Sequence, residues 1–320
     1  MRLGVDPKID YAFKRLFGME RNRDVLIDLI DSVLQLPPEQ RISDIQILNP
    51  FNEKETLDDK LSIVDIKARD QLGRQYNIEM QMLAYQVFRK RVLYYWAKLY
   101  QQQLHESDDY LSLKPTISIC FLDSVLFSEV PDYHLKFKLL DAVHGLRLTE
   151  DLEIHLLELP KFLRRPEELV DPLDRWLYFM RYAEQMDVDA FPDALDTPVI
   201  SRAMEELKML TQNDLERERY EARVKLQRDA ITSIKAARLE GIAEGRKDGL
   251  VEGHKEGLVE GHREGLIDGW KEGLFGRISL CQRLLKRPVM SAEQLAGLSL
   301  QELARLADSL ELELQQKAQL

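Results

Sequence analysis

Residues 62–82 alternate between apolar and polar side chains over two consecutive stretches, and this pattern restricts the fold more than any other feature of the chain. A period of two residues places successive side chains on opposite faces of a β-strand. The segment from Asp70 to Arg74 separates the two stretches, and Gly73 ends a three-residue loop at the position where a left-handed residue is needed. The pattern therefore predicts a β-hairpin centred on Leu72.

The centre of this hairpin determines which residues face each other. Asp65 and Glu79 lie equally far from the centre, so we expect them to be cross-strand partners with Cβ atoms ~4.5 to 5.5 Å apart. Gln81 shares the face of Glu79 because it lies two residues further along the strand. Adjacent carboxylates repel each other without a cation, and Mg²⁺ prefers oxygen ligands of this kind. The register thus predicts a site for a hard divalent ion.

The same alternation has a simpler interpretation. Polar residues commonly occupy the solvent-facing side of a surface hairpin, where Asp65 and Glu79 would be ordinary solvated side chains. Taken by itself, the spacing favours this second interpretation, and further residues are needed to reverse it.

The first 190 residues predict helices and strands that alternate around the hairpin. Residues 8–36 and 85–104 carry apolar side chains at helical spacing, whereas 116–122 and 154–159 are short apolar runs typical of buried strands. A further helix is expected at 173–186. This order predicts an α/β or α+β domain with a mixed sheet.

The second part of the chain is charged and helical, and it contains a glycine repeat. Nine of the 15 glycines recur every four residues from Gly241 to Gly273, within the units GLVEGHKE, GLVEGHRE and GLIDGWKE. Each glycine costs a helix about 1 kcal/mol relative to alanine. Four residues advance about 400° around a helix, so the glycines form a slowly drifting stripe that another backbone could approach. The repeat indicates either a self-associating or flexible tail helix, or an expansion with little function.

Three regions follow from these patterns. We expect a globular domain at residues 1–195, a long charged helix with the glycine repeat at 196–276, and a small helical end at 277–320 that caps or dimerises the tail.

Composition excludes several classes of protein. A net charge of −11 argues against non-specific coating of nucleic acid, although it allows a local basic groove. Cys120 and Cys281 lie far apart without ligand spacing, so we expect neither a disulfide nor a structural zinc site. No stretch is apolar enough to cross a bilayer, and the N-terminus lacks a signal-like apolar segment. These features predict a cytoplasmic protein without a membrane partner.

Residues around the hairpin resemble the Rpn family of recombination-promoting nucleases, which are transposase-like members of the PD-(D/E)XK superfamily. The matching residues are DYAFK at 10–14, LFG at 16–18, VD at 64–65, NIEMQ at 77–81, and Phe88, Arg91 and Tyr95. The resemblance spans roughly residues 5 to 190, and glycine-repeat tails also occur in that family. It implies a restriction-endonuclease-like core of mixed α/β sheet, here with a long helical C-terminal extension.

The resemblance also implies a catalytic site. Asp65, Glu79 and the backbone carbonyl of Met80 would bind Mg²⁺, and Asp65, Glu79 and Gln81 would be catalytic. Gln81 stands where most of the superfamily has lysine, and the Rpn pattern itself carries glutamine there. The implied activity is Mg²⁺-dependent hydrolysis of DNA by a metal-activated water, leaving a 5′-phosphate and a 3′-hydroxyl.

Several charged residues have more than one interpretation. Lys60 or Lys67 could supply the charge that Gln81 lacks. Asp10 either reaches the metal, directly or through water, or is an acidic residue favoured at a helix N-terminus. Arg91 and Lys14 either contact phosphate or belong to a solvated rim.

Cutting both strands of DNA needs two sites, so a homodimer or higher oligomer through the C-terminal helix is expected. Two other functions remain open. The protein could bind DNA without cutting it, or it could act as an oligomeric interaction protein through the glycine-repeat helix. A Walker A sequence, a GxSxG elbow and an HExxH motif are absent.

Overall fold

The structure is a computed structural model that describes residues 2–49, 51–52, 62–63, 65–83, 86–106, 108–187 and 191–318. The chain forms two compact units, Met1–Ser233 and Ile234–Leu320. The first unit contains the sheet and the hairpin, and the second is helical.

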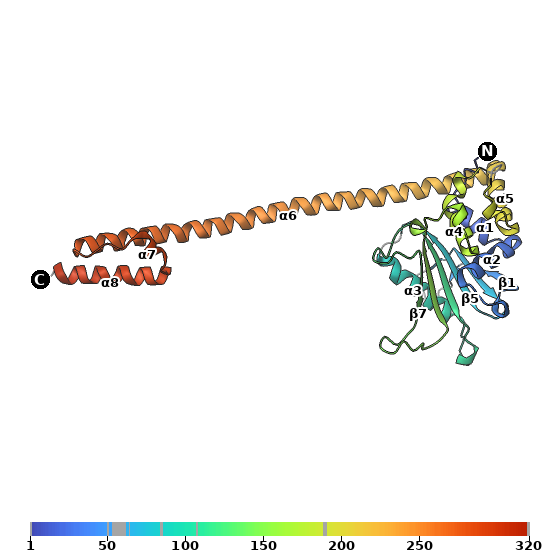
Figure 1. The fold of residues 1–320 in the computed structure, drawn as a ribbon, viewed down its shortest axis with the longest axis horizontal. Coiled ribbons are helices and arrows are strands. Elements are labelled where there is room, and N and C mark those ends of the chain that lie inside the picture. Colours follow the sequence, from blue (N-terminus) through green and yellow to red (C-terminus); the bar gives the residue numbers. More distant parts are fainter. Residues whose placement is uncertain are drawn as a thin grey trace. The chain divides into compact units, whose positions relative to one another are not determined.

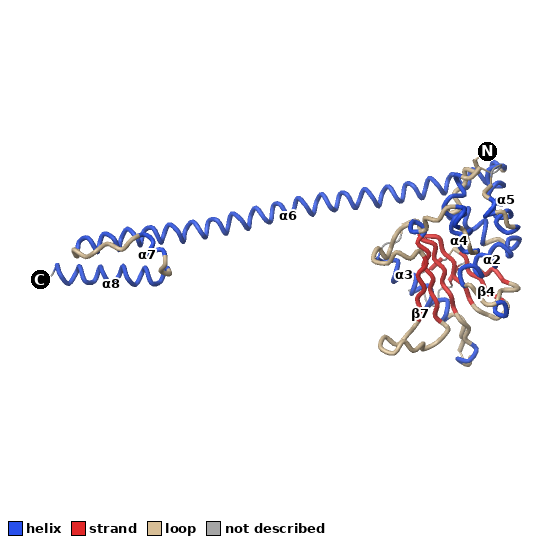
Figure 2. Tube along the Cα trace, viewed as in Figure 1, coloured by secondary structure: helices blue, strands red, loops and turns tan. Residues whose placement is uncertain are grey.

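A six-stranded mixed sheet forms the centre of the first unit (Figures 1 and 2). Its strands, in spatial order, are β1 (Ile45–Leu48), β4 (Ile66–Asp70), β5 (Gln75–Gln81), β6 (Thr116–Leu122), β8 (Leu152–Glu158) and β7 (His134–Lys138). The three strands β5, β6 and β8 run parallel, and the other neighbours are antiparallel. Strands β2 (Phe51–Asn52) and β3 (Ser62–Ile63) form a separate antiparallel pair. The expected mixed sheet is therefore present.

Most helices of the first unit cover one face of this sheet (Figure 1). They are α1 (Asp10–Phe17), α2 (Arg23–Leu34), α4 (Pro172–Tyr182) and α5 (Pro198–Gln212). The main core lies beneath them, where the ring of Phe17 packs 5.0 Å from Phe13 and 5.5 Å from Trp176, measured between centroids. Helix α5 begins just after residue 195, and its buried side chains, Ile200 and Leu207 among them, belong to this core.

Short 3₁₀ helices connect these elements. They are Glu20–Asn22, Pro38–Gln40, Tyr110–Ser112, Leu159–Lys161, Pro166–Glu168, Ala183–Gln185 and Asp193–Leu195.

Helix α3 (Gln86–Gln101) covers the other face of the sheet. Its Phe88 and Val92 pack with Cys120 and Leu122 of β6 in a second, smaller core. Arg91 of α3 contacts Gln81 and Glu79, so the helix lies over the polar side of β5. This placement removes the polar side of β5 from water, whereas Arg69 on β4 is exposed.

The hairpin of β4 and β5 has the predicted register. Ile66 pairs with Ile78, as a centre at Leu72 requires. Gly73 has a φ of +83°, which is the left-handed conformation that the loop needs. The buried carboxylate of Asp70 accepts hydrogen bonds from two backbone N–H groups of the turn and so stabilises it.

The first strand of the hairpin is shorter than the alternation predicts. Strand β4 begins at Ile66, Asp65 lies in a bend, and Ser62–Ile63 pairs with another strand, while Val64 lies outside the described residues. The expectation of one continuous strand was therefore wrong. The reason is local, because the side chain of Asp65 accepts the backbone N–H of Met80, at 3.0 Å, where a ladder partner would otherwise bond.

Strand β7 is absent from the sequence prediction. It lies at the edge of the sheet and has the sequence HLKFK, with only two apolar residues. An edge strand is paired on one side only and needs less apolar character, so its periodicity is weak.

The second unit has a core of its own. The helix α6 (Asp214–Leu284) ends in this unit, followed by α7 (Ala292–Ala296) and α8 (Leu300–Ala318). Ile278 and Cys281 of α6 pack with Leu303 and Ala307 of α8, which runs back along the end of α6 (Figure 1). An ion pair between Arg277 and Glu311, at 2.7 Å, joins the same helices.

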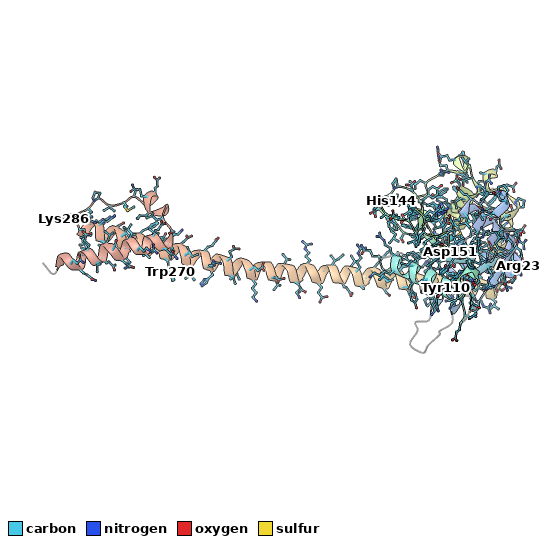
Figure 3. All side chains as sticks on the ribbon, turned by 90° about the horizontal axis from the view of Figure 1, so that it is seen from below. Arg23, Tyr110, His144, Asp151, Trp270 and Lys286 are labelled. Atoms are coloured by element: carbon cyan, nitrogen blue, oxygen red, sulfur yellow. The ribbon has the colours of Figure 1, made fainter. Side chains whose placement is uncertain are left out.

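The glycines of the repeat are not required by packing within the chain. No described atom lies within 4 Å of a Cβ placed on any of the glycines from Gly241 to Gly273, apart from neighbouring backbone of the helix itself. Side chains such as Trp270 project away from this part of α6 (Figure 3). The repeat therefore leaves both its glycines and its apolar residues uncovered by the described chain. Among the described residues, no helix is long and apolar enough to span a membrane.

Candidate active site

The polar side of β5 is buried. Gln75, Asn77 and Glu79 have exposed fractions of 7%, 0% and 5%, because α3 lies over them and β6 lies alongside. The interpretation of the hairpin as an exposed surface element is therefore wrong for β5. A buried carboxylate is costly unless it is paired, protonated or bound to a metal, so Glu79 needs a physical explanation.

Asp65 is oriented by two contacts. Its Oδ2 accepts the backbone N–H of Met80, and its Oδ1 lies 3.3 Å from Nζ of Lys14. Burial raises the pKa of Asp65, while the hydrogen bond from Met80 and the charge of Lys14 act in the opposite direction. The side chain is 21% exposed, so it is only partly removed from solvent.

Glu79 is the most strongly perturbed carboxylate at this site. Burial, and then the charge of Asp65, raise the pKa of Glu79 to about 7. The negative charge of Asp65 contributes to this shift, but the ladder of β4 and β5 ends at the pair of Ile66 with Ile78, so Asp65 and Glu79 are not the cross-strand pair that the hairpin centre predicts. Among the described residues, two weak contacts lower the pKa of Glu79: Asn77 donates to Oε1 at 3.3 Å, and Nη2 of Arg91 lies 4.0 Å from Oε2.

Gln81 is held at both ends of its amide. Its Nε2 donates to the carbonyl oxygen of Leu83 at 2.7 Å, and its Oε1 accepts a hydrogen bond from Nη2 of Arg91. These partners place the amide oxygen toward α3. Gln81 therefore shares its partner Arg91 with Glu79, two residues earlier on the same strand.

Asp10 is connected to the hairpin through Lys14. Nζ of Lys14 lies 2.6 Å from Oδ1 of Asp10, one helical turn earlier, and also contacts Asp65. Burial lowers the pKa of Lys14, but its hydrogen bond to the carboxylate of Asp10 and the charge of Asp65 outweigh this effect and raise the pKa overall. Lys14 thus bridges two of the acidic residues proposed from the sequence.

The other candidate cations are placed differently. Lys60 lies outside the described residues. Lys67 shares the face of the hairpin with Asn77, and its Nζ donates to Oε1 of Gln102 at 3.1 Å, beyond the end of α3. The sequence allows Arg91 to be either a phosphate contact or part of a solvated rim, and the structure places its guanidinium against Gln81.

A sequence signal for this placement exists. Phe88, Arg91 and Tyr95 are three and four residues apart, so they share one face of a helix. In the structure, both rings flank the guanidinium of Arg91. What the spacing does not show is that this face lies over β5.

The oxygen atoms expected to bind a metal here suit a divalent cation that takes few ligands from the protein. In the part of the chain that the structure describes, no cluster of three or more His, Cys, Asp or Glu side chains could hold a metal ion. The expected set has only two carboxylates, Asp65 and Glu79, with a backbone carbonyl. Mg²⁺ is usually held by one or two carboxylates together with water and phosphate oxygens. Burial is the main cause of the raised pKa of both carboxylates, and a divalent cation beside them would favour their charged forms.

A mixed sheet with a hairpin that presents an acidic residue and a Glu-x-Gln triplet defines a protein of the restriction-endonuclease-like class. Comparison with protein families matches residues 7–237 to the PD-(D/E)XK nuclease family transposase, and the chain belongs to this family. The expected membership of the PD-(D/E)XK superfamily is confirmed. Searches among curated proteins and among solved structures give no significant match.

Proposed function

We propose that this protein is a Mg²⁺-dependent DNA endonuclease of the recombination-promoting, transposase-like type. Membership of a nuclease family supports the general class. The observation that carries the proposal is the buried carboxylate of Glu79, whose pKa is raised to about 7 beside Asp65. Two acids that repel each other at a buried position are the arrangement that a divalent cation stabilises.

Asp65 and Glu79 would hold the metal together with the backbone carbonyl of Met80. The N–H of Met80 points toward Asp65, on the β4 side of β5. In a strand, the N–H and C=O of one residue point to the same side, so the carbonyl of Met80 faces that side as well. The same hydrogen bond keeps the carboxylate of Asp65 oriented.

Bound Mg²⁺ would supply Lewis acidity, lowering the pKa of a water ligand and polarising the scissile phosphate. In the hydrolysis, a bond forms between the water oxygen and phosphorus, and the bond from phosphorus to the 3′ oxygen breaks. The water loses a proton and the 3′ oxygen gains one, leaving a 5′-phosphate and a 3′-hydroxyl. Asp65 and Glu79 contribute negative charge at a site where burial strengthens electrostatic interactions.

DNA is the proposed partner despite the net charge of −11. Cations that contact the acidic residues, such as Lys14 and Arg91, give the site a local positive contribution. Cutting both strands requires two sites, and we propose a homodimer or higher oligomer. Exposed apolar residues recur every eight residues along α6, at Leu250, Leu258 and Leu266, and support self-association through this helix.

The decisive experiment is cleavage of supercoiled plasmid DNA with and without Mg²⁺. Asp65→Ala should abolish Mg²⁺-dependent cutting while leaving the circular dichroism spectrum and the melting temperature near those of the unmodified protein. Asp132→Ala removes an exposed carboxylate from a loop and serves as the matched control. Unchanged cutting by the Asp65→Ala variant would remove the enzyme assignment at this site.

A non-catalytic function through the glycine-repeat helix is the second candidate. The uncovered glycines and apolar side chains of α6 favour it. Deleting residues 236–320 separates the two candidates, because a protein that acts through this helix would lose its function without losing cleavage.

A further inference from the structure

The proposed site lacks a lysine at the position where the superfamily motif has one. On the assignment above, Glu79, Met80 and Gln81 correspond to the (D/E)XK triplet in the name of the family, so a neutral amide stands at the lysine position. A phosphate gains negative charge on its oxygens as it is attacked, and a positive group near those oxygens accelerates the reaction. Because Gln81 is neutral, another residue of this chain has to supply that charge.

Two lysines near the hairpin are engaged elsewhere. Lys14 lies within 3.3 Å of the carboxylates of both Asp10 and Asp65, so two negative charges already surround it. Lys67 donates a hydrogen bond to Gln102 beyond the C-terminal end of α3. None of these contacts involves a side chain of the Glu79–Gln81 triplet.

Arg91 is directed at this triplet from α3. Its Nη2 donates to Oε1 of Gln81 and lies 4.0 Å from Oε2 of Glu79. The closer partner is a neutral amide, so this contact positions the guanidinium without neutralising its charge. Gln81 is itself anchored by its bond to Leu83, and it therefore acts as a fixed acceptor for Arg91.

Two aromatic rings flank the guanidinium of Arg91, and some of its N–H donors have no hydrogen-bond partner among the described residues. Cζ of Arg91 lies 5.0 Å from the ring centroid of Phe88 and 5.9 Å from that of Tyr95. Its Nε is buried without a hydrogen-bond partner, and within the described ranges only Nη2 has one. The side chain is 38% exposed, so a ligand can reach the guanidinium, whereas Nε itself is buried.

We propose that Arg91 is a catalytic residue that binds the non-bridging oxygens of the scissile phosphate of DNA. From α3 it supplies the positive charge that the motif lysine would supply from β5. The inference rests on the proposed nuclease function. The planar guanidinium suits this role because its paired N–H groups match two phosphate oxygens, which a lysine ammonium does not.

The test moves a positive charge from position 91 to position 81, where the superfamily motif has lysine. Arg91→Gln should lower kcat for DNA cleavage at saturating Mg²⁺ at least 100-fold and change KM for DNA less than tenfold. Lys90→Gln removes the same charge from the preceding, exposed position of α3 and should leave both constants near those of the unmodified protein. The double variant Gln81→Lys with Arg91→Gln should recover at least tenfold of the lost kcat.

A structural role for Arg91 predicts different results. Loss of packing would not be repaired by a lysine at position 81, so failure of the double variant to recover kcat overturns the proposal. Metal binding gives a readout that does not depend on cleavage. Removing a positive charge 4.0 Å from Glu79 should leave the calorimetric affinity for Mn²⁺ unchanged or higher, and a weakened affinity would mean that Arg91 organises the ligands instead.

Failure of the inference is distinguishable from failure of the proposed function. Plasmid cutting by the unmodified protein with an undiminished kcat for Arg91→Gln overturns only the role of Arg91. Absence of Mg²⁺-dependent cutting by the unmodified protein overturns the nuclease assignment and this inference together.

Discussion

Nζ of Lys14 lies 3.3 Å from Oδ1 of Asp65, on the same carboxylate whose other oxygen accepts the N–H of Met80. The two contacts come from different elements, since Lys14 belongs to α1 and Met80 to β5. Lys14 therefore supplies a positive charge at the acidic residues from within the chain. A divalent cation that binds Asp65 must compete with this ammonium group.

Replacing Lys14 should make metal binding tighter. In Lys14→Met the competing charge is lost while most of the side-chain volume is kept, so we expect the affinity for Mn²⁺ or Mg²⁺ to rise several-fold. Isothermal titration calorimetry measures this directly. Lys90→Met, on the exposed side of α3, is the control for a general loss of one positive charge. An affinity that stays the same or falls would show that Lys14 does not compete for Asp65.

The stability of the metal-free protein should fall as the pH rises from about 4.5 to about 7. In the folded state Glu79 keeps its proton up to a pKa of about 7, whereas the ordinary value of 4.5 applies in the unfolded chain. Between these values the folded state binds more protons than the unfolded state, so raising the pH favours unfolding, by about 3 kcal/mol in total. Urea denaturation in EDTA at a series of pH values measures the dependence.

Glu79→Gln should remove the contribution of Glu79 to this pH dependence, because its amide does not titrate. Glu129→Gln, at an exposed loop position, should keep it. Added Mg²⁺ should stabilise the unmodified protein more at pH 8 than at pH 5, since a metal ligand must be deprotonated. A pH profile that is identical in the unmodified and Glu79→Gln proteins would contradict the burial of a neutral Glu79.

Asp70 should be important for stability and not for catalysis. Its carboxylate is fully buried and accepts hydrogen bonds from the backbone N–H groups of Leu72 and Arg74, from the hydroxyl of Tyr76 and from the guanidinium of Arg74. Asp70→Ala leaves these donors without an acceptor and should lower the free energy of unfolding by about 3 to 5 kcal/mol. Urea denaturation gives the value, with Asp132→Ala as the exposed control; a loss under about 1 kcal/mol would be inconsistent with this network.

The glycine stripe of α6 allows a test of self-association. Changing Gly253, Gly257 and Gly261 to alanine should stabilise an isolated helix by about 1 kcal/mol per site, because no described atom occupies the space of the added Cβ. If a second copy packs on the stripe, the same changes should weaken the oligomer at least tenfold in sedimentation velocity experiments. We expect the triple change to weaken the oligomer.

Gly276 offers the matched control for the stripe. It lies three residues after Gly273, outside the four-residue register, and no described atom is within 4 Å of its Cβ position. Gly276→Ala should leave the association unchanged. An oligomer that survives the triple change would exclude the stripe as its interface.

The sequence predicted the hairpin well because its determinants are local. The turn depends on Gly73 and its neighbours, and the register then follows by counting outward from Leu72. The same counting missed the end of the strand at Asp65, where a side chain takes over a backbone hydrogen bond. The edge strand His134–Lys138 was missed because its stability comes from pairing with β8 and not from its own apolar pattern.

The sequence by itself determined which residues of the hairpin share a face, because a period of two residues follows from backbone geometry alone. Only the tertiary structure decided what lies over that face. Burial of Glu79 results from α3 and β6, and the charges beside it come from Lys14 on α1 and Arg91 on α3. These groups are separated along the chain, and the electrostatic cost of a buried carboxylate depends on distance and solvent exclusion, which exist only once the chain has folded.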